Sequence, residues 1–356
     1  MSTGHDDDAP AALPVPARAG GPTIYDVARL AGVAPSTVSR TFARPGRVSF
    51  ETAERVRAAA EQLHYRSRSV SRRGSAQDRH SSMIAVVVSD ISNPAYFDLI
   101  RGAEEAAAEA GYIVLLAHTH ESDRKEREAL ERTLPLVDGI LLTSSRMSDS
   151  SIRMMAKQKP TIIVNRAVNG VACVVPDNAR GMRRAAEHLA TAGRRSIVYA
   201  AGPEASWADG MRWRALRESA LELELRVHRI GPYEPTSDGG RQAAVKWLEH
   251  RVPAVVLYND LMAMGFLREV RRHGVQVPED VAVVGFDNIQ GLDLVSPSLS
   301  SVAAPMVALG ATAVNNLLAM TRGASPTSNR PMVLPTRLVV RESASLPPAT
   351  TGNSLS

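Results

Sequence analysis

The stretch that decides the first domain is "GVAPSTVSR", residues 32–40. A glycine turn leads into a proline, which suits the first position of a helix because its missing N–H would have no partner there. A helix that starts at this proline turns Val38 inward and leaves Ser36 and Arg40 on the outer face. Hydroxyls and a guanidinium on such a face can reach phosphates and base edges in the major groove of DNA. The stretch therefore predicts a recognition helix.

Helical patterns flank this stretch on both sides. Residues 23–31, "TIYDVARLA", open on a capping pair, Thr23 with Asp26, and Gly32 follows as a helix stop. A third helix starts at Ser49. Three short helices with a tight first turn describe a helix-turn-helix module, although the hydroxyl-rich stretch alone would also fit a capped, exposed helix. The inner face of the third helix is expected to consist of Ala53, Val56, Ala60 and Leu63.

The positive charge of the chain is concentrated in the same segment. Residues 22–80 hold eleven arginines against five acidic residues, while all 356 residues together have a net charge of only +5. Such asymmetry is typical of a polyanionic partner, although a solvated basic surface would look the same. Residues 67–82 have the polar composition of a linker. Residues 1–21 and 343–356 are predicted to be a disordered extension and a disordered tail.

The location of the protein is suggested by what the sequence lacks. No apolar run is long enough for a membrane helix. The N-terminal residues have neither the basic nor the apolar region of a secretory signal. The single cysteine, Cys173, excludes an intramolecular disulfide and is expected to be a small core residue. These features predict a cytoplasmic protein.

From residue 83 onward, apolar runs alternate with amphipathic helices. Parallel strands that are buried on both faces have this pattern, and the number of such units predicts two sheets. Ligands bind beyond the carboxyl ends of the strands in sheets of this kind. The predicted strands cover residues 84–88, 113–117, 139–142, 161–165, 196–200, 254–258 and 281–286.

Polar and aromatic residues recur at those strand ends. Each one alone would fit a helix cap or a turn, but their repetition predicts a shared cleft. Arginine, aspartate and asparagine suit the vicinal hydroxyls of a sugar, and an aromatic ring can cover its apolar face. The residues are Asp90, Asn93, Tyr96, Phe97, Thr143, Ser144, Asn165, Arg166, Asp177, Trp207, Arg212, Asn259, Asp260 and Asp287.

Signals for catalysis and for metal binding are poor. No glycine-rich phosphate loop follows the first strand, and His118 and His120 lack a supporting ligand motif. Asp177, Asp260 and Asp287 have no adjacent nucleophile or base that would make them a catalytic triad. We therefore expect no enzyme activity, no cofactor and no metal site.

Longer motifs resemble a known family. "TIYDVARLAGVAPSTVSRTFA", residues 23–43, is similar to the N-terminal signature of the lactose-repressor (LacI/GalR) family of bacterial transcription regulators, and "VSFETAERVRAAAEQLHY", residues 48–65, continues it. Residues 83–342 resemble the effector-binding core of that family, itself similar to periplasmic sugar-binding proteins. The resemblance implies an α/β fold, with a three-helix helix-turn-helix headpiece at residues 22–66 and a core of two subdomains, each a parallel sheet flanked by helices. The N-subdomain would comprise about 83–175 and 304–333, and the C-subdomain about 176–303 and 334–342.

The resemblance also assigns DNA contacts to individual residues. It places Pro35, Ser36 and Arg40 at the positions where the family reads bases. Contacts with phosphates would orient the headpiece, and the few base contacts would specify the sequence. The residues expected near the phosphate backbone are Thr23, Thr37, Ser39, Ser49, Thr52 and Tyr65.

Two departures from the family pattern concern the headpiece and the hinge. Ala34 stands where the family usually has a capping serine or threonine. In the hinge, Ser67 stands where the family usually has a proline, and Gly74 stands where it has a leucine that enters the minor groove. We expect Arg72 and Arg73 to bind the minor groove electrostatically, with weaker kinking of the DNA, unless the segment is only a disordered linker.

For the effector, the resemblance matches Arg212, Asn259 and Asp287 most firmly to contacts in the family. The predicted function is a repressor that binds a near-palindromic operator as a homodimer and changes its DNA affinity when a small effector, a sugar, binds the core. Several alternatives stay open. The effector could act as an inducer or as a corepressor, and it could be a nucleobase in place of a sugar. The protein could also be a solute-binding protein of a transport system. The remaining effector contacts would come from Asn93, Phe97, Ser144, Asn165, Arg166 and Trp207, the last of which would equally fit packing between subdomains.

Overall fold

The computed structural model describes residues 22–43, 48–63, 65, 81–324 and 330–345. The chain divides into two compact units, one up to Arg79 and one from His80 onward. The predicted extension before residue 22 lies outside the described residues, as do most of the predicted linker and the end of the tail. Among the described residues, no helix is long and apolar enough to cross a membrane.

The first unit consists of three short helices. Helix α1 begins after a capping box in which Thr23 and Asp26 bond each other's backbone, and it ends at Gly32, whose φ of 64° lies in the left-handed region that glycine favours. These features confirm the capping pair and the helix stop predicted from the sequence. The fully buried side chains of Val27, Val38 and Val56 join the helices in one small core. The helices are α1 (Ile24–Ala31), α2 (Pro35–Ala43) and α3 (Phe50–Gln62).

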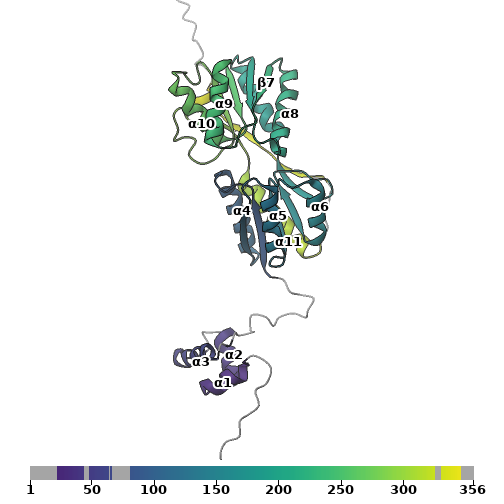
Figure 1. Cartoon of the computed structure of the whole chain (residues 1–356), viewed down its shortest axis with the longest axis vertical. Coiled ribbons are helices and arrows are strands. Elements are labelled where there is room, and N and C mark those ends of the chain that lie inside the picture. The colour runs from purple at the N-terminus through teal and green to yellow at the C-terminus, as the bar shows by residue number, and fades with distance from the viewer. Residues whose placement is uncertain (1–21, 44–47, 64, 66–80, 325–329, 346–356) are drawn as a thin grey trace, which may run out of the picture. The chain divides into compact units, whose positions relative to one another are not determined.

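The second unit contains two six-stranded sheets, which confirms the predicted pair of sheets (Figure 1). In the first sheet all strands are parallel, in the order β11-β5-β4-β3-β1-β2. Helices α4 and α11 cover one face of this sheet, and α5 and α6 cover the other. We call these elements the N-subdomain. They are β1 (Met83–Val88), α4 (Ala95–Glu109), β2 (Ile113–His118), α5 (Asp123–Thr133), β3 (Gly139–Thr143), α6 (Asp149–Gln158), β4 (Thr161–Val164), β5 (Ala172–Pro176), α11 (Met306–Thr321) and β11 (Met332–Leu334).

The second sheet has the order β12-β10-β9-β8-β6-β7, and only its edge strand β12 runs antiparallel to its neighbour. Helices α9 and α10 pack on one face, and α7 and α8 on the other. We call these elements the C-subdomain. They are α7 (Asn178–Thr191), β6 (Ser196–Ala200), α8 (Trp207–Glu222), β7 (Arg226–Ile230), α9 (Ser237–Glu249), β8 (Ala254–Leu257), α10 (Asp260–Arg272), β9 (Ala282–Asp287), β10 (Ser300–Ala303) and β12 (Arg337–Val339).

Three segments of the chain connect the subdomains, after β5, β10 and β11. Two of them are joined by hydrogen bonds. The Asp177 N–H donates to the Leu334 carbonyl at 2.8 Å, and the Thr336 hydroxyl donates to the Asp177 carbonyl at 2.8 Å. Gly181 lets α7 approach them closely, because a Cβ there would lie 2.8 Å from the Thr336 Oγ1 atom. The first and third connections therefore form one hydrogen-bonded pair.

Of the strands that the structure describes, the sequence patterns missed β5, β7, β10, β11 and β12. Strand β7 is an edge strand whose residues are mostly exposed or half-buried, and β10 begins with two buried serines in place of an apolar run. The predicted start of the disordered tail at residue 343 is wrong. Ser343 and Ala344 are buried in a short 3-10 helix, η3 (Glu342–Ala344), and the Ser343 hydroxyl donates to the Val283 carbonyl at 2.7 Å. A polar bond across 60 residues of sequence leaves no local signal in the tail.

Close packing of α4 against α11 depends on glycine and gives a test of the fold. A Cβ at Gly310 would lie 2.1 Å from the Leu99 carbonyl oxygen. We expect Gly310→Ala to lower the free energy of unfolding by about 1–3 kcal/mol or more, because the two helices must separate.

The matched control is Gly210→Ala on α8, where a Cβ would meet no atom within 4 Å. Alanine is the better helix former by up to about 1 kcal/mol, so this variant should be neutral or more stable. Urea unfolding monitored by circular dichroism measures both variants. Equal effects of the two substitutions would contradict the packing described for α4 and α11.

Candidate nucleic-acid interface and effector site

The outer face of α2 carries the side chains expected to read bases. Ser36 and Arg40 are exposed and lie one helical turn apart, so they share one face of the helix. Val38, on the opposite side, is fully buried in the headpiece core and fixes which face is exposed. The other predicted residues of this helix, Pro35, Thr37 and Ser39, are half-buried.

The guanidinium of Arg40 differs from those of its neighbours. Arg29 is 3.1 Å from Asp26 and Arg57 is 2.6 Å from Glu54, so these two arginines are paired on their own helices. Arg40 has no ion pair or hydrogen bond with any residue that the structure describes. An unpaired guanidinium on an exposed helix face can bind a guanine edge through two hydrogen bonds.

Several residues predicted to lie near phosphates are helix caps. Thr23 caps α1, and Ser49 caps α3 by accepting the Thr52 N–H at 3.4 Å. The Ser49 hydroxyl donates to the Thr52 hydroxyl at 2.9 Å, which leaves the Thr52 proton available to a phosphate. Helix N-termini of this kind favour anions. Tyr65 is half-buried, with its ring 6.3 Å from that of Phe42.

The two departures from the family pattern have different outcomes. Ala34 precedes α2, where its carbonyl accepts the N–H groups of Thr37 and Val38 and no capping hydroxyl is present. The hinge residues Arg72, Arg73, Ser67 and Gly74 lie outside the described residues, so their predicted binding to the minor groove stays a prediction.

Arg212 on α8 is the centre of the candidate effector site. Its side chain is 3% exposed, and it donates to the Asn178 Oδ1 atom at 3.2 Å and to the Tyr258 carbonyl at 2.5 Å. It forms an ion pair with Asp287 at 3.4 Å, and its guanidinium lies 3.5 Å from the centre of the Phe286 ring. A buried charge needs such partners because its removal from water is costly.

Asp287 lies at the end of β9, close to Asn93 of the N-subdomain. It has a φ of 104°, a backbone conformation that is rare for any residue other than glycine. Burial raises the pKa of its carboxyl group, and the neighbouring side chains of Arg212 and Asn93 oppose that shift. Asn93 precedes α4 in the N-subdomain, so the structure brings these three predicted residues together.

Ser144 and Asn165 form a second polar pair, at the ends of β3 and β4. Both residues have positive φ angles, 50° and 61°, and the Asn165 amide donates to the Ser144 hydroxyl at 2.9 Å. The Asn165 Oδ1 atom is buried and accepts no hydrogen bond from any residue that the structure describes. A buried acceptor without a partner costs about 1–3 kcal/mol, so this oxygen is a place for a ligand donor.

Two of the other predicted effector contacts, Asn259 and Arg166, are hydrogen-bonded within the protein, whereas the two aromatic ones have exposed surface. Asn259 caps α10 by accepting the Met262 N–H at 2.9 Å, and its amide donates to the Pro235 carbonyl at 3.0 Å. Arg166 donates to the carbonyls of Ser145 and Met147 and pairs with Asp149 at 2.5 Å. Phe97 on α4 is 57% exposed, and Trp207 is half-buried at the start of α8.

Residues that the sequence did not single out as effector contacts complete the site. Tyr258 follows β8, and its hydroxyl lies 3.0 Å from that of Ser206. Gly202 makes room for this tyrosine, since a Cβ there would lie 2.4 Å from the ring. Arg146 and Glu121 form a largely buried ion pair at the strand ends of the N-subdomain. Tyr258 directly follows an apolar run, which was the available signal, whereas nothing local indicates that Arg146 and Glu121 meet.

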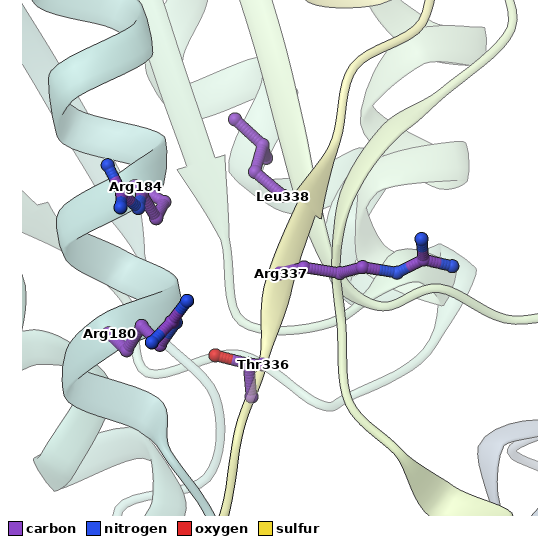
Figure 2. A pocket seen from close by; sticks show the side chains of 5 residues that line it. All are labelled: Arg180, Arg184, Thr336, Arg337 and Leu338. Atoms are coloured by element: carbon purple, nitrogen blue, oxygen red, sulfur yellow. The ribbon is translucent and has the colours of Figure 1, made fainter.

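A hollow lies between α7 and β12 (Figure 2). Arg180 and Arg184 of α7 line it on one side and Thr336 and Leu338 on the other, and the side chain of Arg337 extends away from α7. Arg184 is paired with Glu187 on its own helix. The hollow adjoins the pair of connections that cross between the subdomains.

Comparisons with known proteins match both units of the chain. Residues 23–67 match the bacterial regulatory proteins of the lacI family, and residues 186–344 match the periplasmic binding protein-like domain. The chain is 32% identical to a ribose operon repressor of Halalkalibacterium halodurans over 90% of this chain and 96% of that protein. A complex of the transcriptional regulator CelR with cellobiose shares 31% identity over 90% of this chain and 99% of that chain, with a TM-score of 0.67. A LacI family regulator of Enterococcus faecalis with bound ribose shares 29% identity over 74% and 99%, with a TM-score of 0.67.

A helix-turn-helix unit followed by a two-sheet α/β core defines a DNA-binding regulator that responds to a ligand. The chain belongs to the lacI family of bacterial regulatory proteins. It is a ligand-responsive transcription regulator, and the match to the headpiece distinguishes it from a solute-binding protein of transport.

The exposed guanidinium of Arg40 gives a test of base reading. We expect Arg40→Ala to weaken binding to a site selected from genomic DNA by roughly ten- to a hundredfold, because one bidentate base contact contributes about 1–3 kcal/mol. Binding to unrelated DNA should change much less, since a base contact carries specificity. Fluorescence anisotropy at one fixed salt concentration measures both affinities. Arg29→Ala is the control, and an equal loss on both DNAs would show that Arg40 contacts only phosphate.

Asp260 gives a test of the electrostatics behind the site. Burial, together with the nearby Asp287, raises its pKa from 3.8 to about 8. A raised pKa in the folded state stabilises the protein at low pH, and this contribution is lost as the pH rises toward 8. In Asp260→Asn, which resembles the protonated acid, the free energy of unfolding should fall less between pH 5 and pH 8.5 than in the wild type. Urea titrations across this range measure it, and parallel pH profiles would refute the raised pKa.

Proposed function

We propose that this chain is a repressor that binds a near-palindromic operator as a homodimer, and that a neutral sugar bound between the subdomains changes its affinity for DNA. The observation that carries the proposal is the ion pair of Arg212 with Asp287 at the end of β9, where Asn93 of the N-subdomain lies close enough to influence the Asp287 carboxyl group. A ligand that contacts these groups acts on both subdomains at once. Its differential affinity for two arrangements of the subdomains would then shift the equilibrium between them.

The polar groups at the site suit the hydroxyls of a sugar. The Asn165 Oδ1 atom lacks a donor, and a ligand hydroxyl would supply one. The carboxylate of Asp287 can accept a further hydrogen bond from a second hydroxyl. Phe97 and Trp207 are aromatic side chains with exposed surface that could cover the apolar face of a sugar ring.

The charges around the site favour a neutral ligand over a phosphorylated one. Arg212 is paired with Asp287 and Arg166 with Asp149, and Arg146 is paired with Glu121. A phosphate would have to displace one of these carboxylates, with an energetic cost from the buried charge left behind. Ribose and cellobiose, which two of the similar regulators bind, are both neutral.

We infer that the protein has no catalytic activity. Its similar proteins are regulators. Asp177 caps α7 by accepting the Arg180 N–H at 2.9 Å, and both carboxylate oxygens of Asp260 accept hydrogen bonds within the protein. These aspartates are therefore engaged in holding the fold.

We further infer a dimer in the cytoplasm, where bacterial DNA lies. Two headpieces are needed to read the two halves of a symmetric operator. Pro35, Ser36 and Arg40 would read bases in each half. The phosphate contacts would come from Thr23, Thr37, Ser39, Ser49, Thr52 and Tyr65, with Arg72 and Arg73 in the minor groove.

Isothermal titration calorimetry of the full chain tests the ligand class. The probes are ribose, cellobiose, ribose 5-phosphate and hypoxanthine. We expect a neutral sugar to bind, and Asp287→Asn to weaken it by roughly tenfold or more, because a hydrogen bond to a charged group contributes about 1.5–3 kcal/mol. The control is Asp293→Asn, an exposed aspartate near the same loop.

The same titration can contradict the proposal in distinct ways. Binding of ribose 5-phosphate alone would reject the neutral ligand, and binding of hypoxanthine alone would reject the sugar. A sugar that binds without changing the affinity for a selected operator would leave a ligand site but reject its regulatory role.

A further inference from the structure

The loop that follows β9 holds an unusual backbone. Asp287 and Asn288 have successive positive φ angles, 104° and 60°, and neither residue is glycine. Such conformations persist only where the surrounding structure imposes them, and they concentrate at functional sites. Asp287 is also the acid that pairs with Arg212 at the centre of the candidate effector site. What holds this loop therefore sets the geometry of the candidate effector site.

Two of the bonds that hold the loop come from within the C-subdomain core. The Asn288 N–H donates to the Ser301 hydroxyl at 3.0 Å, and the Ile289 N–H donates to the Asp260 Oδ2 atom at 3.0 Å. The Ser301 hydroxyl donates in turn to the Asp260 Oδ1 atom at 2.6 Å. Ser301 and Asp260 are both completely buried, so they form a rigid support beneath the loop.

The third bond comes from the far end of the chain. Arg341, two residues after β12, donates from Nη2 to the Asn288 Oδ1 atom at 3.0 Å. Its Nη1 atom donates to the Leu299 carbonyl at 2.7 Å, and its backbone N–H donates to the Ser300 hydroxyl at 2.8 Å. The guanidinium thus spans two acceptors on different segments. A lysine, with a single ammonium on a flexible stem, does not reproduce this planar arrangement.

The segment that carries Arg341 is directly continuous with the other subdomain. Only Pro335 and Thr336 separate β11, in the N-subdomain sheet, from β12, in the C-subdomain sheet. Thr336 also bonds the first connection through the Asp177 carbonyl. A change in the angle between the subdomains must act on this short connection, and β12 transmits it to Arg341.

We propose that Arg341 is a positioning residue for the effector site, which holds Asp287 in its strained conformation through Asn288 and links that conformation to the third connection between the subdomains. The inference rests on the proposed function only in so far as Asp287 contacts the effector. The positioning itself concerns the protein without any ligand. It can therefore be tested separately from the identity of the effector.

Hydrogen–deuterium exchange of the full chain, read by mass spectrometry, tests the positioning. In Arg341→Met, which retains much of the side-chain length, we expect the Asn288 and Ile289 amides to exchange at least tenfold faster. The β9 amides before Asp287 should keep their protection, because their bonds belong to the sheet ladder. Arg341→Lys should restore protection only in part.

Arg337→Met is the matched control. Arg337 is an exposed arginine at the start of β12, without an ion pair or hydrogen bond to any described residue, and its side chain extends away from α7 (Figure 2). This variant should leave the loop unchanged. Unaltered exchange at Asn288 and Ile289 in Arg341→Met would overturn the proposal. Uniformly faster exchange across β8, β9 and β10 would also overturn it, because Arg341 would then stabilise the sheet as a whole.

A titration with ribose and with cellobiose adds the functional readout. We expect Arg341→Met to weaken whichever sugar the wild type binds by about tenfold, while Arg337→Met binds normally. If neither sugar binds the wild type, the proposed ligand class fails and the exchange result still decides the positioning. Faster exchange of the loop together with unchanged sugar affinity would refute the link to the effector site.

Discussion

The buried guanidinium of Arg212 is the constraint around which the core is arranged. A charge that is 3% exposed is tolerable only when hydrogen bonds and an opposite charge replace water. The partners of Arg212 are Asn178, the Tyr258 carbonyl and Asp287, from the start of α7 and the ends of β8 and β9. These segments are far apart in sequence, and all three contact the guanidinium of Arg212. The ends of the C-subdomain strands are therefore fixed by electrostatics as much as by the sheet itself.

Strain and unsatisfied polarity are concentrated at the same ends of the strands. Ser144, Asn165, Asp287 and Asn288 all have positive φ angles, and the Asn165 Oδ1 atom lacks a donor. The strands beneath them are parallel and buried, so their ladders provide a rigid base for irregular loops. The strands supply the stability, and the loops at their ends can therefore hold strained backbone and unpaired polar groups that would each be unfavourable alone. This arrangement also explains why a ligand that supplies hydrogen bonds can alter the balance between arrangements of the subdomains.

Much of the headpiece could be predicted from sequence because its determinants are local. The capping box at Thr23, the left-handed Gly32 and the proline that starts α2 each act within one turn of helix. The same holds for the long apolar strands of the core. The buried inner strand β5 was missed although residues 171–175 form an apolar run. Strands β7, β10, β11 and β12 escaped prediction because they are short, polar or at edges, where neighbours rather than composition determine the pairing. The buried η3 segment escaped for the same reason.

The candidate effector site divides in the same way. The residue types at the strand ends followed from the sequence, since parallel topology places all carboxyl ends of a sheet at one edge. The sequence by itself determined the module order, the helix caps, the buried strands and the polar character of those ends. Only the tertiary structure decided that Arg212 meets Asp287, that Arg166 is bound by its own subdomain, and that Arg341 holds Asn288. Those outcomes depend on distances between residues that are remote in sequence. A buried polar group is stabilising when it has a hydrogen-bond partner and costly when it has none, so its contribution depends on the tertiary structure around it.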